Sequence, residues 1–171
     1  MKTLSTSEHV HHARVTNKGF MLLEVVIASA MITMVLLSID LYYKKILDVS
    51  QETTRRIQSG FLLEEGFETL KLVRDQSWSG NIAVLIPGQT YQLRWTGTAW
   101  TVTTLPQPIE NFFTRTFVIA NVNRDASDNI APPGTNDPGT KKIVMQVSWR
   151  EGRNATTTES AETYITNLFS N

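Results

Sequence analysis

The side chains that most often carry acid–base or metal chemistry are scarce in this chain of 171 residues. It contains no cysteine, and its three histidines, His9, His11 and His12, all lie near the N-terminus. General acid–base catalysis and most transition-metal sites at neutral pH rely on imidazole or thiolate groups. Elsewhere only carboxylates, hydroxyls and amines remain, so the composition argues against an enzyme.

One carboxylate has an unusual position, because Glu24 is the only charged residue in the apolar run FMLLEVVIASAMITMVLLSI, residues 20–39. Within a membrane such a group costs on the order of 2.5–3.5 kcal/mol even on the lenient insertion scale, so it requires a partner or a function. Cleavage of the chain after Gly19 would supply a partner, since Phe20 would then carry a free amine near Glu24. The simpler alternative is a carboxylate that snorkels to the nearby membrane surface.

A second set of oxygen donors lies in residues 123–140, whose three prolines, two glycines and three aspartates predict a long irregular loop. Asp125, Asp128 and Asp137, with Asn129, are ligands of the type that calcium prefers. Their spacing does not match an EF-hand loop, and turn-forming Asp and Asn explain the composition equally well. Calcium is therefore a weak candidate, and no other cofactor is expected.

The element that must position Glu24 is a hydrophobic helix. At about 1.5 Å per residue, residues 20–39 span roughly 30 Å, the thickness of the hydrocarbon core of a bilayer. The sequence therefore predicts one membrane-spanning helix. A secretory signal is the alternative, since Ala28-Ser29-Ala30 imitates a cleavage site, but Glu24 would lie in its apolar core and the run continues past that cut.

The charges of the chain balance, with 16 basic and 16 acidic residues, so nucleic acid is not expected as its main partner. Lys18 precedes the apolar run directly, which favours a cytoplasmic N-terminus. Basic residues follow the run as closely, so charge alone leaves the orientation open. These later residues are Lys44, Lys45, Arg55 and Arg56.

Residues 18–25, KGFMLLEV, resemble the processing site of type IV prepilins and pseudopilins: a polar basic leader, Gly, Phe, three hydrophobic residues and Glu at the head of an apolar helix. In that family a membrane prepilin peptidase cuts after the glycine and methylates the new N-terminus. The resemblance implies that Gly19 ends the leader, Phe20 is methylated and Glu24 is the assembly glutamate. It also implies other pilin subunits, the peptidase, an inner-membrane assembly platform and, before assembly, membrane lipid as partners.

The resemblance further implies a single-pass protein of the cytoplasmic (inner) membrane with its head outside, later part of an extracellular or periplasmic filament. The expected divisions are a cleaved leader, 1–19; a transmembrane or filament-core helix, 20–43; its amphipathic continuation, 44–76; and a β head, 77–171. Many members carry a proline within the apolar segment, whereas the first proline here is Pro87. Whether the helix melts on assembly is therefore open.

Beyond the apolar run, hydrophobic residues recur at helical spacing to about residue 76, where the sequence SWSGN predicts a stop. The period then changes to two, with turn residues between the apolar segments. The fold class expected is α+β and pilin-like, a long N-terminal helix packed on a C-terminal antiparallel sheet. The predicted strands are residues 91–95, 100–102, 112–122, 143–149 and, after a turn at 151–154, 155–168.

Two other groups of residues have plain structural interpretations. Glu64, Glu65 and Glu68 form an acidic helix face, which is typical of a solvated surface. The tryptophans are expected in strand packing, with a sugar- or base-stacking surface as the alternative. They are Trp78, Trp95, Trp100 and Trp149.

The leading functional hypothesis is a structural subunit, a minor pilin or pseudopilin, of a type IV pilus-like filament. A pseudopilin of a type II secretion or DNA-uptake machine would share the same features. A second hypothesis is a membrane-mounted head that binds DNA, a glycan or a partner pilin. A third, an unprocessed membrane enzyme, lacks an obvious catalytic group.

Overall fold

The structure, a computed structural model, describes residues 18–151 and 155–168. The predicted leader before Lys18, its three histidines and the predicted turn at 152–154 lie outside these residues. The chain forms two compact units, Met1–Ser50 and Gln51–Asn171. The division falls inside the long helix, between the boundaries expected at residues 43 and 76.

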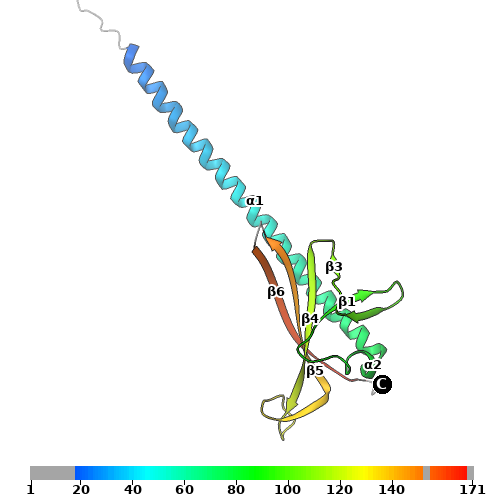
Figure 1. Cartoon of the computed structure of the whole chain (residues 1–171). Coiled ribbons are helices and arrows are strands. Elements are labelled where there is room, and N and C mark those ends of the chain that lie inside the picture. The colour runs from blue at the N-terminus through cyan, green and yellow to red at the C-terminus, as the bar shows by residue number, and fades with distance from the viewer. Residues whose placement is uncertain (1–17, 152–154, 169–171) are drawn as a thin grey trace, which may run out of the picture. The chain divides into compact units, whose positions relative to one another are not determined.

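Helix α1, Lys18–Gln76, is continuous over 59 residues, as the spacing of apolar residues predicts (Figure 1). It ends at the predicted stop, where the Ser77 hydroxyl accepts a hydrogen bond from the Gly80 backbone N–H at 3.0 Å. This bond caps the single turn α2, Trp78–Asn81, and turns the chain toward the sheet.

Six antiparallel strands follow, which confirms the α+β class and the predicted antiparallel sheet. Their order is β2-β1-β4-β5-β6, with β3 paired to β4. The predicted hairpin is present, with Trp95 opposite Trp100. The strands are β1 (Thr90–Trp95), β2 (Trp100–Thr103), β3 (Pro108–Ile109), β4 (Phe113–Arg124), β5 (Thr135–Glu151) and β6 (Ala155–Thr166).

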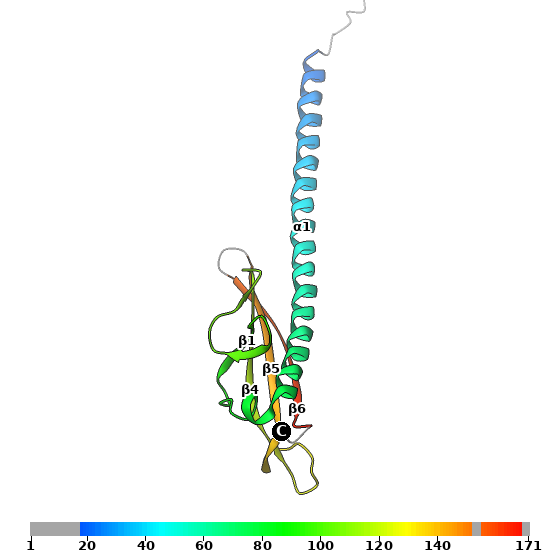
Figure 2. The same cartoon turned by 90° about the vertical axis from the view of Figure 1, so that its right-hand side faces the viewer.

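The core lies between the sheet and the part of α1 that belongs to the second unit, which runs along the strands in both views (Figures 1 and 2). On α1, Leu63, Leu70 and Val73 are buried. Opposite them, the apolar positions of β5 that alternate in sequence are all buried, as their period of two predicts. These are Ile143, Met145, Val147 and Trp149.

The tryptophans divide between the core and the hairpin. Trp78 and Trp149 are buried in the core. Trp95 and Trp100 pair across the hairpin with ring centroids 5.5 Å apart. Core packing therefore accounts for Trp78 and Trp149, whereas Trp95 pairs with Trp100 but remains 52% exposed. The exposed Glu64, Glu65 and Glu68 match the solvated face expected of them.

The segment 123–140 corrects the sequence prediction, because only residues 125–134 are a loop. The β4–β5 ladder continues beyond a register shift at Asn121/Val122, pairing Arg124 with Thr135. Pro138 falls at this shift, and a bulge is a place where a strand tolerates proline. Local composition indicated a loop, but pairing with the distant strand β4 decides the structure.

Helix α1 lies close to β4 and β5 at Gly66. A Cβ atom built on Gly66 would overlap the Met145 Sδ atom and lie 2.9 Å from the Arg115 Cδ atom. The Arg115 side chain is 6% exposed, and its Nη1 atom lies 3.4 Å from a Glu65 carboxylate oxygen. The same nitrogen donates a hydrogen bond of 2.9 Å to the Leu62 carbonyl. The absence of a side chain at Gly66 thus allows a buried arginine to pack beneath the helix.

We predict opposite effects of alanine at two glycines of α1. Gly66→Ala should lower the free energy of unfolding of the head by about 1–3 kcal/mol, since overpacking at the sheet outweighs the gain in helix propensity. Gly60→Ala is the matched control: nothing lies within 4 Å of its Cβ position, so it should be stabilising by up to about 1 kcal/mol. Thermal unfolding of the full chain in mild detergent, followed by near-UV circular dichroism, measures both, and equal stabilisation would contradict the close approach.

Candidate functional site

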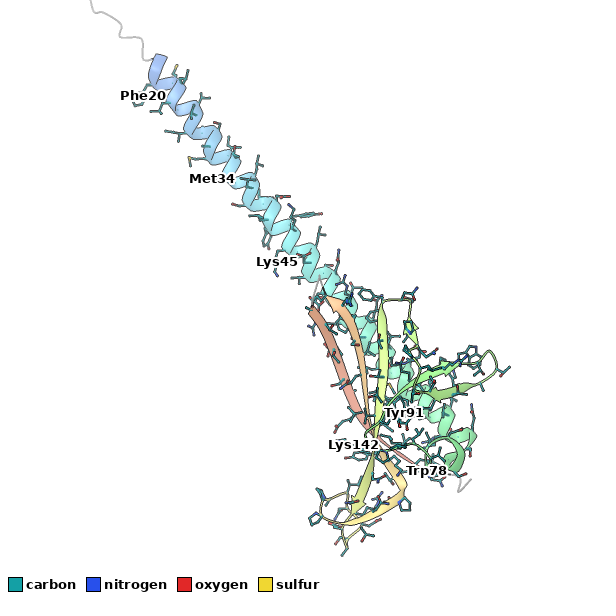
Figure 3. The ribbon with its side chains drawn as sticks, in the orientation of Figure 1. Phe20, Met34, Lys45, Trp78, Tyr91 and Lys142 are labelled. Atoms are coloured by element: carbon teal, nitrogen blue, oxygen red, sulfur yellow. The ribbon has the colours of Figure 1, made fainter. Side chains whose placement is uncertain are left out.

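The first unit contains the candidate site, the apolar part of α1. Its side chains point outward around the helix, as the labelled Phe20, Met34 and Lys45 show (Figure 3), and Phe20 is 74% exposed. An 18-residue window of mean hydropathy 2.4 contains no buried residue, which makes the helix long and apolar enough to cross a membrane. An apolar surface of this size requires a cover of lipid or of other protein.

The hydroxyl groups in this apolar stretch are satisfied within the helix. Ser29 donates to the Val26 carbonyl at 2.9 Å, and Thr33 donates to the Ser29 carbonyl at 2.8 Å. Ser38 donates to the Met34 carbonyl at 2.8 Å. Internal bonds of this kind are what a polar group needs where no water is present. The hydroxyls therefore present no obstacle to burial in lipid or in a helix bundle.

Glu24 differs from these hydroxyls, since it has neither a hydrogen bond nor an ion pair within residues 18–151 and 155–168. It lies beside five apolar side chains, those of its chain neighbour Leu23 and of four residues about one to two turns away. These are Phe20, Leu23, Ile27, Ala28 and Met31. A carboxylate in this apolar setting needs a cation from outside the described residues, or water.

The two predicted processing residues lie at the start of the same helix. Gly19 and Phe20 are helical and exposed, and nothing lies within 4 Å of the Cβ position of Gly19. Phe20 is four residues before Glu24, so the two share a face one turn apart. The structure thus brings all three predicted residues, Gly19, Phe20 and Glu24, to one end of α1.

Two of the three aspartates proposed as weak calcium ligands, Asp128 and Asp137, lie beside a cation that the sequence reasoning missed, Arg124. Its Nε atom lies 2.7 Å from the Asp137 carboxylate and 3.6 Å from that of Asp128. Its Nη1 atom donates to the Asp128 carbonyl at 2.9 Å. The hydrogen bond from Arg124 is the main reason that the pKa of Asp137 lies below its usual value.

Asp125 has a different role, that of a turn residue. Its Oδ1 atom accepts hydrogen bonds from the backbone N–H groups of Ser127 and Asn129, at 2.8 and 2.9 Å. The bonds from Asn129 are the largest cause of its lowered pKa. Within the described part of the chain, no three His, Asp or Glu side chains are grouped so that they could hold a metal ion. Turn formation and the arginine thus account for the composition of this loop.

A second polar cluster, also missed from the sequence, joins α1 to the edge strand β6. Arg56 lies 2.8 Å from the Glu52 carboxylate and 2.5 Å from that of Glu159. Beside it the Thr157 hydroxyl donates to Glu151 at 2.5 Å, the main cause of the lowered pKa of Glu151. These contacts hold the open edge of the sheet against the helix.

Comparison of the chain with protein-family models, with curated proteins and with solved structures gives no match.

The Arg124–Asp137 pair predicts an acid-sensitive contribution to the stability of the head. Because the pKa of Asp137 is lowered by folding, its contribution is present above the ordinary value of about 3.9 and is lost as the pH falls through the folded value. Asp137→Asn should therefore lower the unfolding temperature at pH 7, and the difference from the unsubstituted chain should shrink below about pH 4. Asp128→Asn, at a side chain 86% exposed, is the control with a smaller effect. A difference that stays constant from pH 7 to pH 3 would contradict this assignment.

Proposed function

We propose that this chain is a structural subunit of a type IV pilus-like filament, cleaved after Gly19 and assembled through its apolar N-terminal helix. The observation that carries the proposal is Glu24, a carboxylate without a partner in the described residues. It lies in an apolar run whose three hydroxyls, those of Ser29, Thr33 and Ser38, are bonded within the helix. Cleavage would create a cation close to Glu24, the Phe20 amine.

The proposed pairing is between neighbouring subunits. When copies of the helix stack side by side, the Phe20 amine of one copy approaches the Glu24 carboxylate of the next. Both charges are then neutralised in a water-free core, where an unpaired carboxylate would be unfavourable by several kcal/mol. Because the pair forms at one relative height of the two helices, it also sets the register between subunits.

The exposed apolar surface of α1 supports the same proposal. Lipid covers this surface before assembly, in a subunit of the cytoplasmic membrane whose N-terminus lies inside and whose head lies outside. Neighbouring helices replace the lipid in the filament, and no additional apolar surface has to be exposed in the exchange. The peptidase and a membrane assembly platform are the further partners that this route requires. A pilus, a type II secretion system and a DNA-uptake machine all suit this chemistry.

The first test of the proposal is the mature N-terminus. In a host that assembles such filaments, mass spectrometry should find a chain that lacks residues 1–19 and begins with N-methylated Phe20. Gly19→Leu should leave the leader attached, because the peptidase site is lost, without altering a head that begins at Gln51. Intact leader in assembled filaments would refute the proposed processing.

The second test concerns the carboxylate itself. Glu24→Gln should leave the subunit processed and membrane-inserted but should reduce filament assembly at least about tenfold. The Phe20 amine of the neighbour would then be buried without a counter-ion, which costs about 3–5 kcal/mol at each contact. Glu64→Gln makes the same chemical change on the solvated face and should assemble normally. Filament counts by electron microscopy, with immunoblots of membrane fractions, compare the two variants. Equal assembly would remove the role proposed for Glu24.

A further inference from the structure

A band of interfacial residue types follows the apolar part of α1 directly. Tyr42 and Tyr43 are 68% and 61% exposed, and Lys44 and Lys45 follow them. We name these four residues the collar. Tyrosine collects at membrane–water boundaries because its ring is apolar and its hydroxyl is polar, and lysine extends its amine from there to the lipid phosphates.

Among the described residues, three of the four polar groups of the collar have no partner in the chain: the two tyrosine hydroxyls and the Lys45 amine. Tyr42 packs back along the apolar surface beside Ser38 and Ile39. Lys44 is paired with Asp40 at 2.7 Å, which neutralises the first acidic residue after the apolar run. Neither tyrosine hydroxyl has a hydrogen-bond partner within residues 18–151 and 155–168, so headgroups or water must supply one.

The position of the collar sets the depth of Glu24. Eighteen residues separate Glu24 from Tyr42 along one unbroken helix, which corresponds to about 27 Å. A tilt of about 20° shortens this to roughly 25 Å, slightly less than a hydrocarbon core of about 30 Å. With the collar at the outer boundary, Glu24 therefore lies within one helical turn of the inner boundary rather than at the bilayer centre.

We infer that the collar contacts the phospholipid headgroups of the outer leaflet and thereby holds the Gly19–Phe20 bond at the level of the inner headgroups. The bond lies about 6 Å beyond Glu24, one helical turn closer to the cytoplasm. The lipid contact itself is independent of the filament, whereas its consequence for cleavage rests on the proposed function. The occupant of this surface is a phospholipid bilayer, with a second copy of the helix as the competing possibility.

The lack of cysteine makes the inference directly measurable, because every introduced cysteine is the only one in the chain. The full chain, spin-labelled at one position at a time, is reconstituted in vesicles of phosphatidylethanolamine and phosphatidylglycerol. Accessibility to oxygen relative to a water-soluble nickel chelate then reports depth in the bilayer. The labelled variants are Ile27→Cys, Met31→Cys, Val35→Cys, Ile39→Cys and Val49→Cys.

Relative accessibility to oxygen should be greatest near Met31 and should fall to the aqueous level by Val49. Removing the collar with Tyr42→Ala/Tyr43→Ala should move the maximum by about one helical turn, roughly 5 Å, or broaden it. Tyr42→Trp/Tyr43→Trp should restore the original profile, since tryptophan suits the same boundary. Leu36→Ala/Leu37→Ala, which removes apolar side chains away from the boundary, is the matched control and should leave the maximum in place.

The possible contrary results are distinguishable. An unchanged profile in the Tyr42→Ala/Tyr43→Ala variant would overturn the collar but leave a membrane-spanning helix and the filament proposal intact. Low accessibility to both reagents along the helix would show that second copies cover it instead of lipid, which also overturns the collar. Because the vesicles contain no peptidase or assembly platform, failed processing or assembly in a host would refute the proposed function without changing this profile.

Discussion

The constraint on which the rest of the protein depends is that the Glu24 carboxylate has no ion pair or hydrogen bond within the described residues. A carboxylate among apolar side chains is stable only beside a cation or water, and the helix around it supplies neither. The chain meets the requirement for every other polar side chain of the apolar run by bonding hydroxyls to its own carbonyls. A cation or hydrogen-bond donor for the Glu24 carboxylate must therefore come from lipid headgroups, from water or from another copy of the chain. In the filament that we propose, that need would give the apolar helix a preferred depth in the membrane and a preferred register against a neighbour.

In the head, by contrast, charged side chains are paired with oppositely charged side chains of the same fold. Arg124 secures the β4–β5 loop through Asp137, and Arg56 joins the helix to the edge strand β6 through Glu159. Arg115 is buried beneath α1 but bonded to a backbone carbonyl and close to Glu65. Each of these three arginines in the described head therefore has a carboxylate of the same chain within ion-pair distance.

The unpaired apolar segment and the packed amphipathic segment belong to one helix, because neither a proline nor a break separates them. No proline precedes Pro87, and the single weak position that matters for packing, Gly66, is used to bring the helix close to the sheet. The amphipathic part of α1 buries Leu63, Leu70 and Val73 in the core beneath the sheet. In the part of the chain that the structure describes, no side chain of the apolar part is buried. The same secondary structure thus passes from a segment that needs an external cover to one that is a component of a folded core.

The sequence alone determined the long helix, its end at Ser77, the hairpin at Trp95 and Trp100, and the antiparallel sheet, because each rests on a local period or a local turn signal. It also singled out Gly19, Phe20 and Glu24, whose meaning lies in their spacing along one helix. Only the tertiary structure decided that residues 135–140 belong to a strand, that Gly66 lies against Met145 and that Arg124 neutralises the aspartates near it. Those features depend on contacts between residues that are far apart in the chain. Strand pairing of this kind can override the local preference of prolines, glycines and aspartates for a loop.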